Sequence, residues 1–197
     1  MKPKLSTRTA SKYKGAMATN YETKRMKQMR WHQENAIVTG MLSAAHGLAT
    51  VLDVPVGTGR YLALYQQLGL NAVGVDTSTN MLALAQRKML PVQLVRGSAL
   101  ALGFQDQEFD AVVCVRFLDL IEEEAMRQAV KEICRVARIM VICTIRLGAE
   151  YVLKVNTATH DADRFRDLVG QCGWHIAEQQ PIFKQGWFLL RLTRGIT

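Results

Sequence analysis

Two acidic residues and a pair of glycines carry the clearest chemical signal in this sequence. Asp53 ends a short apolar run, and the turn Gly57-Thr58-Gly59 follows before a helix-like stretch begins. Glycines let a backbone approach a ligand closely, and the start of a helix offers unpaired N–H groups. Asp76 ends the next apolar run, where a carboxylate can accept hydrogen bonds from both hydroxyls of a ribose. This spacing indicates a site for a nucleotide-like ligand.

Dinucleotide-binding proteins share both features, but two positions here differ from their fingerprint. That fingerprint has a third glycine for close packing of helix on strand, and this chain has Leu62 there. The fingerprint also does not include an acidic residue just before the glycine loop, whereas this chain has Asp53 there. Because a carboxylate there can reach the amino group of a methionine-containing ligand, both differences favour S-adenosylmethionine (SAM) over NAD.

Strand-like and helix-like segments alternate along the chain. Apolar runs predict strands over residues 50–54, 72–75, 92–95, 109–115 and 139–145, and a last pair over 174–179 and 187–193. Helical spacing predicts helices over 16–46, 60–68, 81–85 and 162–169, and one from 122–124 that Arg135 and Arg138 close. This order predicts a three-layer α/β/α sandwich around a mostly parallel sheet, with a C-terminal antiparallel hairpin.

From about residue 50 to its C-terminus, the chain resembles the class I SAM-dependent methyltransferases. The glycine loop is similar to the first motif of that family, and Val73-Gly74-Val75-Asp76 is similar to the second. The later blocks follow in the family's order, namely 96–99 with 102–104, 109–114, 129–136 and 172–174. The resemblance implies a seven-stranded sheet in the order 3-2-1-4-5-7-6 and methyl transfer from SAM.

The resemblance also implies roles for individual residues. It places the methionine end of SAM against Asp53, Val56, Gly57, Thr58 and Gly59, and the ribose against Asp76. It places the adenine between Thr77 and Met81 with its edge at Ser98 and Ala99, and the sulfur near Cys114, Val115 and Arg116. Ser98 departs from the family's aspartate, which removes a charged acceptor for the adenine amino group. Pro55 and Val56 replace a smaller pair and stiffen the loop without changing its glycines.

Two further pairs of residues have two interpretations each. Tyr21 and Arg25 lie one helical turn apart on one face of the predicted helix. In the first interpretation, Tyr21 or Arg25 contacts the carboxylate of SAM. In the second, both belong to an exposed basic helix face. Asp119 and Arg116 follow the fourth predicted strand. They are candidates for a general base and an anion clamp, or else polar residues of a surface loop.

The net charge of +8 is concentrated at the N-terminus, because residues 1–30 hold nine basic side chains against one acidic one. We expect a basic arm over 1–14, followed by a single domain over 15–197. The arm either holds an anionic partner such as nucleic acid or is a solvated tail.

The four cysteines lack the spacing of a zinc site, and no apolar run approaches the ~20 residues of a membrane span. These features predict a cytoplasmic protein without a metal site.

The sequence leaves the methyl acceptor open. Residues 115–119 differ from the Asn/Asp-Pro-Pro-aromatic motif of the family's amino-methylating nucleic-acid enzymes. We expect a small-molecule acceptor, while a lipid-linked or sugar acceptor and a protein side chain stay open. Arg116 and the basic arm favour an acidic or phosphorylated acceptor. Two other hypotheses remain, a SAM-binding protein that does not catalyse methylation and a nucleic-acid methyltransferase that its basic arm anchors.

Overall fold

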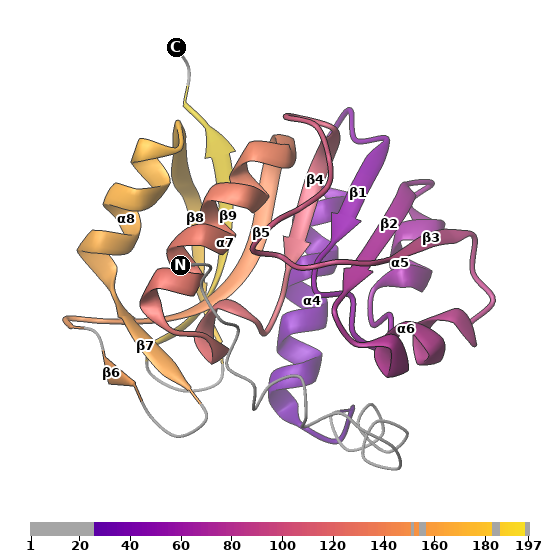
Figure 1. The fold of residues 1–197 in the computed structure, drawn as a ribbon, viewed down its shortest axis with the longest axis horizontal. Helices are drawn as coiled ribbons and strands as arrows, with labels where there is room; N and C mark the ends of the chain where they lie inside the picture. The colour runs from indigo at the N-terminus through magenta and orange to yellow at the C-terminus, as the bar shows by residue number, and fades with distance from the viewer. Residues whose placement is uncertain (1–25, 151, 154–156, 183–185, 196–197) are drawn as a thin grey trace.

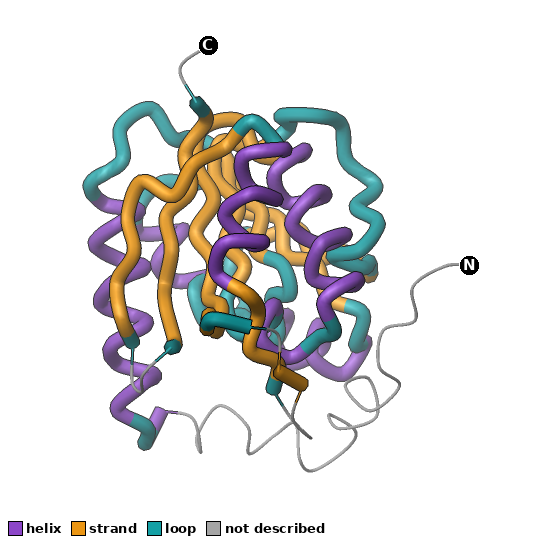
Figure 2. The backbone as a smooth tube through the Cα atoms, turned by 90° about the vertical axis from the view of Figure 1, so that its left-hand side faces the viewer, coloured by secondary structure: helices purple, strands orange, loops and turns teal. Residues whose placement is uncertain are grey.

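The structure is a computed structural model that describes residues 26–150, 152–153, 157–182 and 186–195. One twisted sheet has helices on both of its faces (Figures 1 and 2). Its strands are β1 (Thr50–Asp53), β2 (Asn71–Asp76), β3 (Val92–Arg96), β4 (Phe109–Cys114), β5 (Ala137–Gly148), β6 (Val152–Leu153), β7 (Ala158–Asp161), β8 (Trp174–Pro181) and β9 (Trp187–Arg194). Its helices are α4 (Met29–Ser43), α5 (Leu62–Gln67), α6 (Thr79–Gln86), α7 (Glu123–Val136), α8 (Ala162–Gln171) and the 3-10 turn η1 (Leu118–Leu120).

The main sheet runs in the order β3-β2-β1-β4-β5-β9-β8. Neighbouring strands from β3 to β5 are parallel, and β9 is antiparallel to both β5 and β8. Strands β8 and β9 form the expected C-terminal hairpin and correspond to strands 6 and 7 of the predicted sheet. The predicted order 3-2-1-4-5-7-6 and the three-layer sandwich are thus confirmed.

Two short strands were not expected. Strand β5 continues to Gly148, beyond the end predicted at residue 145. Its pairing with β9 stops at Arg146, where β9 begins. The last two residues of β5 pair instead with β7, and β6 pairs with β7. The overhang of β5 beyond β9 thus creates a small additional ribbon at the carboxyl ends of the strands.

The core has two halves because side chains alternate across each strand. Leu52 of β1 and Val112 of β4 face the apolar cluster formed with α7 and α8. Their neighbours Val51 and Val113 face the cluster formed with α4, α5 and α6. Figure 2 shows the corresponding helix layers on either side of the strands.

Two predicted helix boundaries were wrong. The expected helix over 16–46 is interrupted, because Gln28 has an extended backbone (φ −94°, ψ 130°) and α4 begins at Met29. Residues 16–25 of that prediction and the arm over 1–14 lie outside the described residues. Arg138 does not close α7, since the chain turns directly into β5 at Ala137 and Arg138 pairs with Asp110. None of the described helices is long and apolar enough to cross a membrane.

Candidate functional site

The turn between β1 and α5 needs glycine at two positions. Gly57 and Gly59 have φ angles of +55° and +76°, in the left-handed region that other residues rarely adopt. A Cβ atom on Gly59 would lie 2.5 Å from Leu62 Cδ1, whereas one on Gly57 would meet no atom within 4 Å. Gly59 therefore makes room for Leu62, while the space beside Gly57 stays open.

Asp76 joins the end of β2 to this turn. Its Oδ2 accepts a hydrogen bond from the Gly57 N–H at 2.9 Å, and its Oδ1 accepts one from the Ser78 N–H at 2.8 Å. Burial raises the pKa of Asp76, and these N–H groups act against that rise. Each carboxylate oxygen has two lone pairs, so Asp76 can hold the turn and still accept hydrogen bonds from a ligand's hydroxyls.

Asp53 is a buried carboxyl at the end of β1. Only 3% of its surface is exposed, and its Oδ2 accepts a hydrogen bond from the Tyr65 hydroxyl at 3.1 Å. Burial raises the pKa of Asp53 to about 7. The positive charge of Arg60 acts against this rise without cancelling it. Such a buried carboxyl favours a further positively charged group beside it, and the ammonium of an amino acid is such a group.

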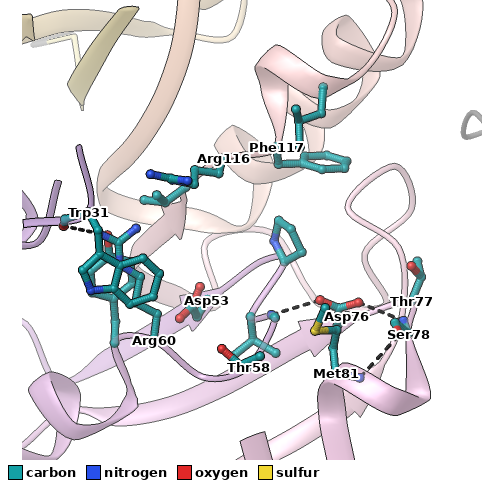
Figure 3. Close-up of a pocket in the computed structure, with 16 residues that line it drawn as sticks. Trp31, Asp53, Thr58, Arg60, Asp76, Thr77, Ser78, Met81, Arg116 and Phe117 are labelled. Carbon is teal, nitrogen blue, oxygen red and sulfur yellow. Dashed lines mark hydrogen bonds between the residues drawn. The ribbon is translucent and has the colours of Figure 1, made fainter. Parts of the chain in front are cut away.

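A cavity opens between the carboxyl ends of β1, β2 and β4 (Figure 3). Nine residues of the sequence-based site line it: Asp53, Val56, Gly57, Thr58, Asp76, Thr77, Met81, Val115 and Arg116. Seven others also line it: Trp31, Pro55, Arg60, Tyr61, Ser78, Phe117 and Leu120. Figure 3 shows Asp76, Thr77 and Met81 at one end, Trp31 and Arg60 at the other, and Arg116 and Phe117 across from Asp53.

Five residues of the expected site are not among the described residues that line the cavity, namely Gly59, Ser98, Ala99, Cys114 and Asp119. Cys114 is fully buried in the half of the core that contains α7, because it points to the opposite face of β4 from Val113. The Ser98 hydroxyl instead accepts a hydrogen bond from the Leu100 N–H at 3.2 Å. Tyr21 and Arg25 lie outside the described residues.

Arg116 and Asp119 lie where β4 ends, but their surroundings differ. Arg116 has a φ of +59°, and its N–H donates a 2.5 Å hydrogen bond to the Thr144 hydroxyl of β5. Asp119 is 2% exposed in η1, and burial raises its pKa to about 6. Arg116 therefore faces the cavity, whereas the Asp119 carboxyl lies behind the cavity wall.

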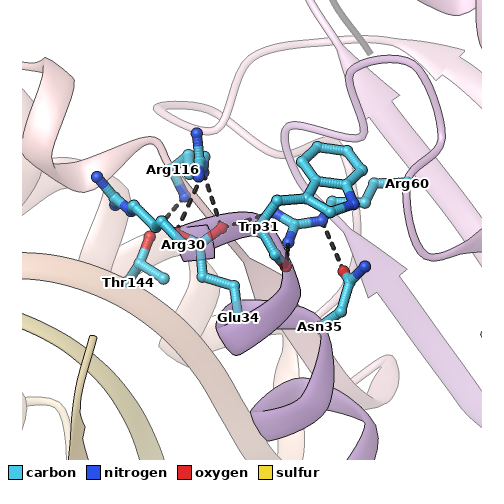
Figure 4. Close-up of polar contacts among 7 residues, drawn as sticks. All are labelled: Arg30, Trp31, Glu34, Asn35, Arg60, Arg116 and Thr144. Carbon is cyan, nitrogen blue, oxygen red and sulfur yellow. Dashed lines mark hydrogen bonds and ion pairs between the residues drawn. The ribbon is translucent and has the colours of Figure 1, made fainter. Parts of the chain in front are cut away.

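A fully buried glutamate from α4 lies among three arginine side chains (Figure 4). Glu34 accepts from Arg30 Nε at 2.6 Å, from Arg60 Nη1 at 2.6 Å and from Arg116 Nε at 2.8 Å. Burial acts to raise the pKa of Glu34, but the three guanidinium groups outweigh it and lower that pKa. We call Glu34 and these arginines the Glu34 cluster. It connects α4, the glycine turn and the loop after β4.

Arg60 anchors α4 over the glycine turn with its whole guanidinium group. Its Nε donates to Asn35 Oδ1 at 2.7 Å and its Nη2 to the Trp31 carbonyl at 2.5 Å. The same group lies 3.7 Å from the centre of the Trp31 ring, close enough for a cation–π interaction. Trp31, Glu34 and Arg60 were not predicted as site residues, although the position of Glu34 was a signal. It shares the buried stripe of α4 with Trp31, Val38, Met41 and Leu42, and an acid in an apolar stripe needs a partner.

Comparison with known proteins agrees with this architecture. Residues 51–139 match the family model described as "Methyltransferase domain". A demethylmenaquinone methyltransferase from Renibacterium salmoninarum is 34% identical over 109 residues, which is 55% of this chain and 44% of that protein. A glycine/sarcosine N-methyltransferase from Parasynechococcus marenigrum is 38% identical over 94 residues, or 44% of this chain and 33% of that protein. The matches thus span less than half the length of these curated relatives.

The fold is also found in a solved structure. Magnesium protoporphyrin IX methyltransferase from Synechocystis PCC 6803, with bound S-adenosylhomocysteine (SAH), has a TM-score of 0.80 and 16% sequence identity. The likeness covers 96% of this chain and 99% of that one. Residues 51–139 of the chain are thus similar to a methyltransferase domain, and its fold is that of this solved methyltransferase.

Proposed function

We propose that this protein binds SAM in the cavity of Figure 3 and transfers its methyl group to a small-molecule acceptor. The main support is the placement of two buried carboxyls, Asp53 and Asp76, at the ends of adjacent parallel strands beside the Gly57–Gly59 turn. The Asp53 carboxylate would bind the ammonium of SAM, and Asp76 would accept from the ribose hydroxyls. Thr77 and Met81, at the Asp76 end of the cavity, would flank the adenine.

Methyl transfer asks mainly for alignment and exclusion of water. SAM, when bound, would supply a methyl group on a positively charged sulfur, so that an acceptor lone pair could bond to the methyl carbon as the S–CH₃ bond breaks and its electron pair stays on sulfur, leaving SAH. The residues of this chain that act on the acceptor are then those opposite Asp53, including Arg116 and Phe117. They would hold the acceptor in line with the methyl group, where orientation provides much of the rate.

An acceptor that carries a proton on its reacting atom must lose that proton. Asp119 is our candidate for the proton acceptor, because a pKa of about 6 leaves its carboxyl ionised at neutral pH. The side chain does not line the cavity in this structure, so the role requires the acceptor or a water to reach it past Phe117 or Leu120.

The names of the relatives favour a small acceptor. The curated relatives described above are named for small molecules, demethylmenaquinone and glycine or sarcosine. A nucleic-acid acceptor would depend on the basic residues 1–30, most of which lie outside the described residues. A SAM-binding protein without activity remains the alternative, and it would bind SAH as tightly without forming product.

Calorimetric titration with SAH tests the cofactor site. We expect binding to the parent protein and loss of that binding in Asp76→Ala. Asp106→Ala is the matched control, because Asp106 is an exposed acid that pairs with Arg135 in the last turn of α7. Absence of SAH binding by the parent protein would refute the proposed function. Binding without methyl transfer from radiolabelled SAM to any acceptor would favour the non-catalytic alternative.

A further inference from the structure

The Glu34 cluster carries more positive than negative charge in a buried place. The side chains of Arg30, Arg60 and Arg116 are 11%, 9% and 10% exposed, and that of Glu34 is 0% exposed. Asp119 is the second acid whose charge acts on Arg30 and Arg116. Arg60 also acts on the buried Asp53, so the three cations outnumber the nearby anions while the Asp53 carboxyl is protonated. An excess charge out of water is unfavourable unless a counter-charge accompanies it.

Two of the three arginines also have a side-chain nitrogen whose hydrogen-bonding capacity is unused among the described residues. Arg30 Nη2 and Arg116 Nη2 are shielded from solvent and have no hydrogen-bond partner among the described residues. Each of these arginines uses its Nε to hold Glu34, so the far edge of the guanidinium is left for another acceptor. Arg60 differs, because its Nε, Nη1 and Nη2 all donate within the protein.

The open donors lie on the side of Glu34 that faces β5 and β9. Figure 4 shows Arg30, Arg116 and Thr144 on one side of Glu34 and Arg60 with Asn35 on the other. The Arg30 guanidinium lies 3.8 Å from the centre of the Trp187 ring at the start of β9. Arg116 lines the cavity and also contacts Glu34. The two unpaired donors therefore lie across Glu34 from Arg60 of the glycine turn, and of the two arginines Arg116 lines the cavity whereas Arg30 lies behind its lining.

The backbone of Arg116 supports a binding role. A non-glycine residue at a φ of +59° is unfavourable by itself, and such residues concentrate at functional sites. Here the Thr144 hydroxyl accepts the Arg116 N–H and fixes the conformation. Glu34 fixes the other end of the side chain. The backbone and the side chain of Arg116 are thus both fixed by contacts, while its Nη2 has no partner among the described residues.

We propose that Arg30 and Arg116 form the receptor for a carboxylate of the methyl acceptor, so that the substrate class is a small organic acid. The inference rests on the proposed function, because it assigns the acceptor side of the same cavity. A carboxylate matches the paired edge of a guanidinium group, and charged hydrogen bonds of this kind are strong where water is excluded.

Benzoate and its neutral counterpart benzamide are suitable probes of the receptor. The SAH-loaded protein would be titrated with each, while the Nε–H signals of the arginines are followed by nitrogen-15 NMR and the affinities by calorimetry. We expect benzoate to bind and to shift the signals of Arg30 and Arg116, and benzamide to shift neither. Equal behaviour of the two probes, including no binding of either, would overturn the proposal.

Variants separate the receptor from a structural role and from the cofactor site. We expect Arg30→Gln and Arg116→Gln each to weaken benzoate binding about tenfold, the scale of one charged hydrogen-bond pair, and to leave SAH affinity nearly unchanged. Arg116→Lys keeps the charge without the planar fork and should restore benzoate binding only in part. Arg166→Gln is the matched control, because Arg166 lies on the exposed surface of α8 and pairs there with the exposed Asp163. Since Glu34 keeps two arginines in each variant, the folded state should persist.

Two outcomes contradict the proposal in different ways. If the arginine variants lose SAH affinity and leave benzoate binding unchanged, the cluster holds the carboxylate of the cofactor instead. If the parent protein does not bind SAH, the proposed function fails, and the same titrations on the unloaded protein still decide whether the arginines bind a carboxylate.

Discussion

Glu34 Oε2 and Arg60 Nη1 lie 2.6 Å apart, and this ion pair joins α4 to the turn that follows β1. Helix α4 precedes the sheet in the chain, yet it closes one end of the cavity through Trp31. Glu34 therefore helps to position the helix, together with the hydrogen bonds of Arg60 to Asn35 and to the Trp31 carbonyl. The proposed cofactor site and the proposed acceptor side share this acid.

Removal of the Glu34 charge should destabilise the protein strongly. In Glu34→Gln the three buried guanidinium groups lose their common counter-charge, and a buried ion pair that loses one partner costs about 3–5 kcal/mol. Chemical denaturation of the protein without ligand measures this cost. Glu124→Gln, on the exposed surface of α7, should change the free energy of unfolding by less than about 0.5 kcal/mol. Similar small effects for both variants would show that the cluster is not essential for the fold.

SAH binding should depend on pH through Asp53. Its pKa of about 7 in the free protein means that the carboxyl is largely protonated below that pH. An ammonium group needs the carboxylate, so affinity should rise with pH by up to about tenfold per unit below pH 7 and level off above it. Calorimetry across this range measures the effect. Asp53→Asn should bind SAH weakly with no such rise, and a parent affinity that is independent of pH would contradict the role of Asp53.

The same residue should have the opposite effect on stability. The folded-state pKa of Asp53 lies above the ordinary value of 3.8, so the folded protein holds the proton more tightly than the unfolded chain. The resulting stabilisation is present at acid pH and is lost as pH rises toward 7. Above pH 7, Asp53→Asn should thus increase the free energy of unfolding without ligand by roughly 1–3 kcal/mol. A loss of stability there would indicate that Asp53 is structural.

The two glycines of the turn should respond differently to alanine. Gly59→Ala places a methyl group against Leu62 at an unfavourable backbone angle, and we expect a loss of about 2–4 kcal/mol in stability. In Gly57→Ala the added methyl group meets no atom, so only the positive φ angle is unfavourable. This angle costs about 1–2 kcal/mol of stability, and the methyl group narrows the cavity. We therefore expect Gly57→Ala to weaken SAH binding at modest cost to the fold. Equal destabilisation by the two variants would contradict this assignment.

The sequence predicts the part of the site that is local. Asp53, the glycine turn and Asp76 follow one another through two strand-to-helix connections, and parallel pairing brings them to one edge of the sheet. The same alternation of strands and helices predicts the sheet order. These features need only short segments and the handedness of their connections.

The sequence does not predict the parts that depend on contacts between distant segments. Arg116 contacts Glu34 from a loop that lies 82 residues away in the chain. The spacing of residues along the sequence does not predict such a long-range pair. Cys114 shows a second limit, because its neighbours Val115 and Arg116 line the cavity while Cys114 itself faces α7. Which face of a strand points to a site depends on register, and a shift of one residue reverses it.

A crystal structure of the protein with SAH tests the central claim most directly. We predict the amino nitrogen of SAH within hydrogen-bond distance of the Asp53 carboxylate and both ribose hydroxyls at Asp76. We also predict that Arg30 Nη2 and Arg116 Nη2 stay out of contact with the cofactor. SAH bound elsewhere, or bound with its ribose at Asp53, would contradict the proposed cofactor site.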